Sequence, residues 1–401
     1  MITEYLEILN RKFKDFDPEY RKQAYIYYLK APKPEYKESP TRKTYVEIPD
    51  EDIERMVYGN VEGSNIEYNS DADVFIKDLE IKKSPNDVLV TDMKDALKNH
   101  NDIYSRYLSD KYGNVRLEYL INASWLNGYF IYVPDNKSIS LNIESINPSS
   151  SFASKNVIIA GKNSNVEITD VYRSYGPERA IHGRNIYIIA EENSSVKYNY
   201  IQNESENTNI VSFIRAYEMP YSSVSIYNIN NGGDKIVYFS EPVMYDNTSY
   251  NSYGVNISNG SCELDIQDNS LQIGASTSAD IYTRGVIINN GTILHHGNID
   301  IEEKSIKSTG FYDSSIILMS ENGHANSKPA LLIKNNNTKS KHGSYISTVD
   351  EEKITYLRSR GISYSDARRL FISGFLGYIQ DKGCSKKAEE LLDEFINALR
   401  F

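Results

Sequence analysis

The chain has 401 residues, of which 44 are Lys or Arg and 55 are Asp or Glu, so its formal net charge is −11. This charge argues against a general nucleic-acid binder, which needs a basic surface to displace counterions from phosphates. No apolar run approaches the roughly 18 residues of a membrane span and the first residues do not form a signal peptide, so a cytoplasmic protein that does not enter a membrane is expected.

The cysteine content excludes several kinds of site. Cys262 and Cys384 are the only two cysteines, and they lie far apart in the sequence. They cannot form a zinc ribbon, a CxxC redox pair or a disulfide framework, nor can they complete a four-thiolate iron–sulfur site. Cys262 is expected to be a buried, inert thiol and Cys384 to be incidental. If the protein handles a metal or a cluster, a partner must supply ligands.

Residues 1–114 are predicted to form a helical and mixed N-terminal region. Apolar residues recur at helical spacing between Tyr5 and Phe13, and Asp17-Pro18 is typical of the start of a second helix that ends near Tyr28. Thr91 or Asp92 is expected to cap a later helix. A proline-containing linker is expected over 31–45, a short helix over 48–56, and strands over 74–81 and 88–90.

A parallel β-helix is predicted over 115–338. This stretch shows alternating strands of about three to five residues, separated by Asn, Gly and Ser. The segments 156–168 and 185–198 nearly repeat, and they begin at Asn156 and Asn185. A β-sandwich has about seven strands over about 100 residues, whereas this pattern continues for twice that length, which favours a solenoid.

The composition of this stretch fits the corners and faces of such a solenoid. Asn and Gly tolerate the left-handed backbone that corners need. The many tyrosines are expected on outer strand faces, where the ring packs and the hydroxyl stays in water. The end of a solenoid also has an open strand edge, which is a physical reason to expect a dimer.

Residues 339–401 are predicted to form a helical C-terminal region. Ser363 and Ser385 are expected to cap helices, and Gly361 and Gly383 to end them. Two short helices cannot bury their apolar stripes alone, so docking on the solenoid or on another protein is expected. The stripes comprise Ala367, Leu370, Phe371, Gly374, Phe375, Tyr378 and Ile379 in one helix and Ala388, Leu391, Leu392, Phe395, Ile396 and Leu399 in the next.

Motifs spread over roughly residues 88–380 are shared with a known family. The most specific lie over 326–376 and comprise residues 326–333, Lys341-His342-Gly343, Asp350-Glu351-Glu352, Tyr356-Leu357-Arg358-Ser359-Arg360-Gly361-Ile362-Ser363, Asp366-Ala367-Arg368-Arg369-Leu370 and Gly374-Phe375; weaker ones lie at 88–93, 125–134 and 285–299. This set resembles the SufB/SufD family, the paired scaffold subunits of the SUF iron–sulfur cluster assembly machinery.

The resemblance implies a mainly β protein, a right-handed parallel β-helix flanked by N-terminal and C-terminal helical regions. It also implies pairing of SufB with SufD through the β-helices, and one SufC-type ABC ATPase docked on each C-terminal helical region. An iron–sulfur cluster would be present only transiently at the subunit interface, and none would be bound tightly by this chain alone. The implied ATPase contacts are Arg360, Leu370, Phe371, Gly374 and Phe375.

His342 is the metal candidate that the resemblance implies. A neutral imidazole can bind iron, so His342 is a possible iron or cluster ligand. His342-Gly343 looks like the SufD form of the motif, but Ser340 and Ser314 occupy positions where family members carry thiols. This departure puts direct thiolate ligation by this chain in doubt. The alternative is a surface His in the turn between solenoid and tail.

The other histidines are expected to be structural or exposed. His295 and His296 are adjacent in a predicted strand, where neighbours face opposite sides, so they are not expected to bind one metal together. His182 and His324 are expected to face solvent.

The hypothesis from the sequence is a SufD-like, non-catalytic scaffold subunit. Its expected partners are a SufC-type ATPase and either a SufB-like paralogue, as a heterodimer, or a second copy of itself, as a homodimer. The alternative is a carbohydrate-active β-helix enzyme, a polysaccharide lyase or hydrolase, which would use clustered carboxylates. The carboxylates to consider are Asp265, Asp280, Asp300, Glu302 and Glu303, and they are expected to form a solvated face.

Overall fold

The computed structural model describes residues 18–35, 37–39, 42–62, 80–83, 87–125, 127–147 and 150–401. The helix expected between Tyr5 and Phe13, and most of the strand expected over 74–81, lie outside these ranges. The N-terminal elements are α2 (Pro18–Lys30), β1 (Lys37–Ser39), β2 (Arg42–Lys43), α3 (Asp50–Glu62), β3 (Glu80–Lys83), β4 (Leu89–Asp92), α4 (Met93–Asn99), α5 (Asn101–Leu108) and α6 (Arg116–Ser124). Asp92 caps α4, since its carboxylate accepts from the backbone N–H groups of Lys94 and Asp95.

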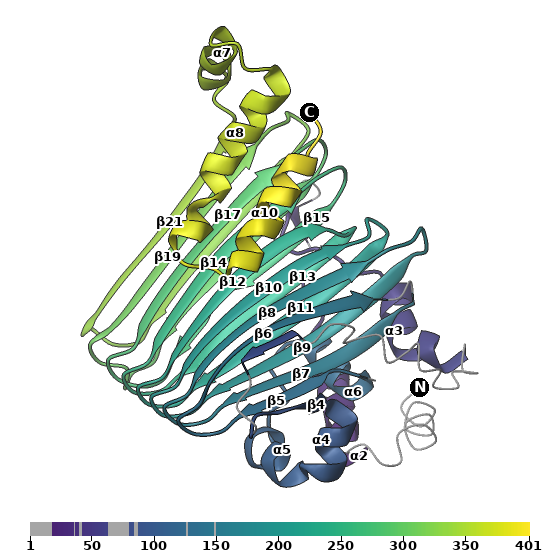
Figure 1. The fold of residues 1–401 in the computed structure, drawn as a ribbon, viewed down its shortest axis with the longest axis vertical. Helices are drawn as coiled ribbons and strands as arrows, with labels where there is room; N and C mark the ends of the chain where they lie inside the picture. Colours follow the sequence, from purple (N-terminus) through teal and green to yellow (C-terminus); the bar gives the residue numbers. More distant parts are fainter. Residues whose placement is uncertain are drawn as a thin grey trace.

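A parallel β-solenoid of about seven turns forms the body of the molecule, which confirms the predicted fold class (Figure 1). Its strands form two sheets, and each turn contributes to both. Sheet 1 contains β6 (Ser138–Asn147), β8 (Asn165–Ser174), β10 (Ser195–Glu204), β12 (Ser223–Gly232), β14 (Ser249–Ser258), β17 (Ser278–Ile287), β19 (Ser308–Leu318) and β21 (Thr338–Thr348). Sheet 2 contains β5 (Tyr129–Val133), β7 (Phe152–Ala160), β9 (Ala180–Ala190), β11 (Thr208–Glu218), β13 (Lys235–Met244), β15 (Glu263–Asp268), β16 (Ser270–Gln272), β18 (Thr292–Ile301) and β20 (His324–Ile333).

The strands are longer than the sequence predicted. Most have 9 to 11 residues, so the expectation of three to five residues is wrong. The reason is that Asn and Ser, which favour turns, here lie within strands and bond to the neighbouring rung. Asn230 donates to the side-chain oxygen of Asn256 one rung away, at 2.9 Å. The sequence repeat aligns Asn156 with Asn185. In the structure Asn185 pairs instead with Lys155, one residue earlier.

Corners of the solenoid use left-handed backbone, as predicted. Asn136, Asn163, Asn193 and Asn247 have φ between 55° and 61°. The N–H of Asn163 donates to the carbonyl of Glu192 in the next corner at 3.0 Å. Stacked corners are therefore held both by backbone hydrogen bonds and by residues that tolerate this conformation.

The interior contains tyrosine as well as aliphatic residues. Tyr129, Tyr172 and Tyr198 are almost fully buried, and their hydroxyls donate to one carboxylate oxygen of Asp170 at 2.5 to 2.8 Å. The expectation of tyrosines with solvated hydroxyls is wrong for these residues. A buried hydroxyl is tolerated because Asp170 accepts its hydrogen bond inside the core.

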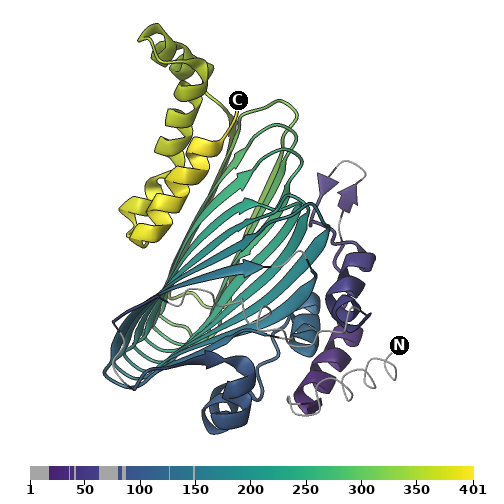
Figure 2. The ribbon, with the colours of Figure 1, turned by 45° about the vertical axis from the view of Figure 1, so that its right-hand side comes forward.

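Helices from the two ends of the chain cover the two outer faces (Figure 2). The N-terminal helices pack on sheet 2, where Trp125, Val157 and Tyr187 belong to one buried cluster. The C-terminal helices pack on sheet 1 against residues such as Ile229 and Val286. These are α7 (Glu351–Ser359), α8 (Tyr364–Leu376), α9 (Tyr378–Asp381) and α10 (Lys386–Ala398). In the described ranges, no helix is both long and apolar enough to span a membrane.

Candidate functional site

The last rung of the solenoid is open. Within the described residues, β20 pairs only with β18 and β21 only with β19, so each has an edge without a strand partner. Ile333 and Ile346 pair in register with Ile301 and Ile316 of the preceding rung, which are buried. Ile333 and Ile346 are nevertheless 39% and 43% exposed. Long unpaired edges beside exposed apolar side chains are typical of a surface that pairs with another chain.

His342 lies in the middle of this open rung. It is part of β21, pairs with the buried Tyr312 and is exposed. Because paired residues of parallel strands point the same way, His342 lies on the inner face of the rung. Lys339 and Lys341 alternate with it and therefore project to the outer face. The histidine is thus on a strand, not in the turn between solenoid and tail.

Ser314 and Ser340, at the family thiol positions, lie at different depths. Ser340 is on the open strand β21, two residues before His342. Ser314 is 1% exposed, one rung deeper, where it pairs with Ser344. The open end therefore brings Ser340 and His342 together on one face and leaves Ser314 one rung deeper, beneath Ser344.

A buried histidine reaches Ser314, which the sequence did not predict. Nδ1 of His295 lies 2.9 Å from the Ser314 hydroxyl, and Nε2 lies 3.2 Å from the amide nitrogen of Asn256. An amide nitrogen only donates, so Nε2 accepts and the ring proton is on Nδ1, donated to Ser314. Burial lowers the pKa of His295 to about 3. Although the three side chains resemble a catalytic triad, His295 gives its proton to the serine and cannot act as its base.

His296 confirms the expected alternation, and His182 corrects an expectation. His295 is fully buried inside, whereas His296 packs outside under the ring of Tyr45 at 5.1 Å. His182 does not face solvent: it is 0% exposed, and its Nδ1 lies 2.6 Å from Glu204. Burial opposes the Glu204 charge, but Arg184 and His182 hold its pKa down at about 2. The sequence pattern around His182 did not reveal its distant partner Glu204.

The remaining sequence-predicted candidates are one exposed histidine and two buried cysteines. His324 is exposed at the start of β20, and Cys262 is buried, with its thiol pKa raised by burial. Cys384 is also buried, within the tail between α9 and α10, and burial raises its pKa to about 12.

The carboxylates considered for a carbohydrate-active site are scattered. Asp265 is buried on the outer face of sheet 2 and accepts from the Val46 N–H at 3.0 Å. Asp280 lies on sheet 1, and Asp300 pairs with Lys334. In the part of the chain that the structure describes, no three His, Cys, Asp or Glu side chains are grouped to bind a metal ion.

The tail buries one side on the solenoid and exposes the other. Ala367, Ile372, Leu376 and Ile379 are fully buried, whereas Leu370 is 53% exposed. The buried stripe of α8 therefore differs from the predicted one, because tertiary packing selects a neighbouring face of the helix. The predicted caps Ser363 and Ser385, and the buried stripe of α10, are confirmed.

The predicted ATPase contacts divide between these two sides. Phe371 and Phe375 are half-buried and pack against the cluster that holds the tail on sheet 1. Arg284 of β17 stacks on the Phe375 ring at 5.1 Å. Arg360, Leu370 and Gly374 are exposed. A substitution at Phe371 or Phe375 would therefore disturb the tail itself as well as any partner.

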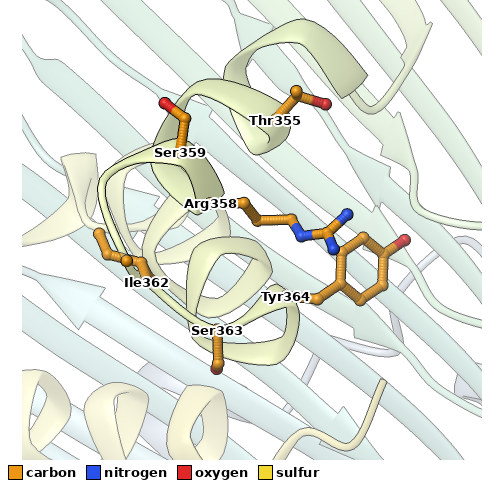
Figure 3. Close-up of a pocket in the computed structure, with 7 residues that line it drawn as sticks. Thr355, Arg358, Ser359, Ile362, Ser363 and Tyr364 are labelled. Carbon is orange, nitrogen blue, oxygen red and sulfur yellow. The ribbon is translucent and has the colours of Figure 1, made fainter.

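A hollow lies where α7 meets α8 (Figure 3). Arg358 extends toward the ring of Tyr364, with 5.6 Å between guanidinium and ring centre. The neighbouring Tyr356 is 58% exposed and contacts Arg360. Exposed tyrosine and arginine are typical of protein–protein contact surfaces. The hollow is lined by Thr355, Arg358, Ser359, Gly361, Ile362, Ser363 and Tyr364.

Comparison with known proteins matches the solenoid and the start of the tail. The family model "SUF system FeS cluster assembly, SufBD core domain" matches residues 143–375, more than half of the chain. The iron–sulfur cluster assembly protein SufD of Bacillus subtilis is 26% identical over 299 residues, which cover 72% of this chain and 68% of that protein. A SufBD family iron–sulfur cluster assembly protein of Trieres chinensis is 24% identical over 305 residues, 72% of this chain and 63% of that protein. The matched region thus spans about two thirds of the length of these relatives.

Proposed function

Because this chain belongs to the SufBD family of SUF-system iron–sulfur cluster assembly proteins, as its motifs predicted, we propose that it is a SufD-like scaffold subunit and not an enzyme. It supplies half of a paired β-helix platform, a docking tail for a SufC-type ATPase, and one imidazole, His342, at the pairing edge. The other half is a SufB-like paralogue or a second copy. The cluster is cargo, held transiently at the interface.

The observation that carries this proposal is the open last rung with His342 on its inner face. The last rung exposes apolar side chains whose in-register partners on the preceding rung are buried, so a second solenoid would complete the core. A ligand on that rung would then face the partner and could share a cluster with the partner's thiolates. The proton arrangement at Ser314 and His295 supports a role without catalysis by that serine.

ATPase docking is proposed for the exposed side of α7 and α8. Tyr356, Tyr364 and Leu370 are 58%, 40% and 53% exposed and do not belong to the cluster that fixes the tail. An interface there can form without moving the tail from sheet 1.

Leu370→Glu tests the docking. A charge at this position should lower capture of a SufC-type ATPase by about tenfold or more, since a central apolar contact is worth at least about 2 kcal/mol. The readout is the dissociation constant for the purified ATPase. Leu29→Glu, at a 40% exposed leucine of α2, is the control and should bind normally. Normal binding by Leu370→Glu would reject the docking surface.

His342→Ala tests the imidazole. Removal of a ligand should lower cluster yield on the reconstituted complex by roughly tenfold, with pairing and ATPase binding retained. Cluster absorbance per complex is the measurement, and His324→Ala, at an exposed histidine of β20, is the control. An unchanged yield would remove His342 from the function.

A further inference from the structure

A chain of polar side chains crosses the core of the late rungs and ends at the last one. Asn256 of β14 donates to Nε2 of His295, whose Nδ1 donates to the Ser314 hydroxyl of β19. The Ser327 hydroxyl of β20 donates to the same Ser314 oxygen at 3.1 Å. Asn230 of β12 donates to Asn256 at the other end of the chain. After Asn256, each step of this chain joins one sheet to the other across the core.

The chain can form because a residue of β17 leaves a gap. His295 reaches Asn256 past this strand, whose residue in register between Asn256 and Ile316 is Gly285. A Cβ atom on Gly285 would lie 3.2 Å from Cε1 and 3.4 Å from Nε2 of His295, inside the ordinary separation of about 3.5–4.0 Å. The missing side chain at Gly285 therefore lets the imidazole bond across an intervening strand.

Ser314 lies where both strands of the last rung are attached. Its hydroxyl accepts from Ser327 of β20, and its backbone is in register with Ser344 of β21. A hydroxyl oxygen accepts two hydrogen bonds, so His295 and Ser327 use the full acceptor capacity of Ser314. One buried residue of β19 thus connects the imidazole to both open strands.

Apolar packing holds the last rung less firmly than the earlier ones. The inward-facing Ile333 and Ile346 are exposed, and in the described ranges β20 and β21 each bond to a neighbouring strand along one edge. Apolar contacts are also non-directional, whereas a hydrogen bond constrains both distance and angle. The polar chain therefore supplies a directional constraint exactly where the cover of a further rung is missing.

The imidazole of His295 suits this role because its two nitrogens have different, fixed partners. Asn256 makes Nε2 an acceptor, which leaves the ring proton on Nδ1 for Ser314. Burial holds the pKa of His295 at about 3, so the ring stays neutral at physiological pH. The hydrogen bonds on its two sides are therefore both present under working conditions.

We propose that His295 is the positioning residue of the open rung. Through Ser314 it sets where β20 and β21 lie across the core, and so where the imidazole of His342 stands. His342 is two residues from Ser344, on the same inner face of β21. The consequence for a cluster rests on the proposed function, whereas the positioning of the rung does not.

Ser314→Ala tests the positioning in the free, full-length chain. This variant removes the atom that joins His295 to Ser327 and changes no charge. The backbone amides of residues 324–348 should exchange with solvent about tenfold faster than in the wild type, because the loss of buried hydrogen bonds shifts a local opening equilibrium by about that factor. Hydrogen exchange read by mass spectrometry measures the rates. Unchanged rates in this segment would overturn the proposal.

Ser212→Ala is the matched control. Ser212 of β11 is equally buried, and its hydroxyl lies 2.8 Å from the Tyr200 hydroxyl in the core of an earlier rung. The control removes the same atom from the same core, so exchange over residues 324–348 should stay at the wild-type rate. Equal acceleration by both serine variants would mean general loosening of the core and would also overturn the positioning.

Two substitutions of His295 separate its hydrogen bonds from its bulk. A primary amide carries one acceptor and one donor at about the spacing of the ring nitrogens, so His295→Gln should keep the slow exchange. His295→Leu retains an apolar side chain of similar size and should exchange as fast as Ser314→Ala. Equal rates for the two variants would reduce His295 to packing. Nitrogen NMR of the histidine-labelled wild type should show a neutral ring protonated at Nδ1, and a proton on Nε2 would contradict the assignment.

Cluster yield on the reconstituted complex separates this inference from the proposed function. If exchange responds as expected but His342→Ala leaves the yield unchanged, the positioning stands and the role of His342 falls. If exchange does not respond while His342→Ala lowers the yield, His342 remains a ligand and the positioning falls. Where both respond, Ser314→Ala should lower the yield by about tenfold, as loss of a residue that supports a ligand does. An unchanged yield there would overturn the link between His295 and His342.

Discussion

The two ends of the solenoid are built from the same kind of rung but finished differently. At the first rung, β4 and β3 run antiparallel to β5 and β6 and continue both sheets within the chain. Ile131 and Leu141, which face inward there, are 0% and 1% exposed. At the last rung no strand follows, and the inward-facing Ile333 and Ile346 are 39% and 43% exposed.

This difference shows that the rung pattern alone does not bury the core. Each rung shields its inner residues only when a further layer lies over it. The chain supplies that layer at one end by reversing strand direction, which also stops further parallel addition. At the other end it leaves the parallel edges free, and burial there depends on another molecule.

The largest expected difference between the two ends concerns truncation of one inward-facing side chain at each end. Leu141→Ala should lower the free energy of unfolding by about 2–5 kcal/mol, since it opens a cavity in a sealed core. Ile346→Ala should cost less than about 1 kcal/mol in the isolated chain, because water already reaches the side chain. Urea unfolding of the two variants measures both values. Equal losses would mean that the last rung is closed in the free protein.

A smaller expected effect concerns pH in the sealed interior. Asp268 is buried on β15, with Ser252 and Tyr250 as hydrogen-bond donors, and burial raises its pKa to about 7. A group whose pKa is raised by folding stabilises the protein at low pH and loses that contribution as pH rises to the folded value. Between about pH 4 and pH 7, the wild type should therefore lose roughly 2–4 kcal/mol relative to Asp268→Asn.

Glu204→Gln is the control for this pH effect. The pKa of the Glu204 carboxyl group is lowered to about 2 by Arg184 and His182. The contribution of this carboxylate to the free energy of unfolding is therefore complete above about pH 5. Urea unfolding at several pH values measures the free energy of unfolding of each variant relative to the wild type. Over the range in which this difference changes for Asp268→Asn, the loss for Glu204→Gln should stay constant. A constant difference for both variants would contradict the assigned pKa of Asp268.

Local patterns in the sequence predicted much of this fold. The asparagines at corners, the caps Ser363 and Ser385, and the buried stripe of α10 depend on neighbours within a few residues, and all agree with the structure. The opposite faces of His295 and His296 follow from strand alternation alone. The open edge also follows from the idea of a solenoid with a last rung.

Features set by contacts between rungs could not be predicted in this way. Glu204 is 22 residues from His182, and its contact makes that histidine a buried residue. Asp170 accepts from tyrosines of three different strands, which no local pattern reveals. The contact between His295 and Ser314 arises because two sheets face each other across the core, and strand alternation gives no register between facing sheets.

The position of α10 has a consequence for synthesis of the chain. Ser385, at its start, bonds to Thr169 and Asn199 of β8 and β10, rungs that leave the ribosome some two hundred residues earlier. Until the last helix emerges, the outer face that includes Val171 and Ile201 lacks the cover that α10 gives it in the described part of the chain. Such a surface is prone to aggregate in a nascent protein, so early rungs need a chaperone or rapid completion of translation.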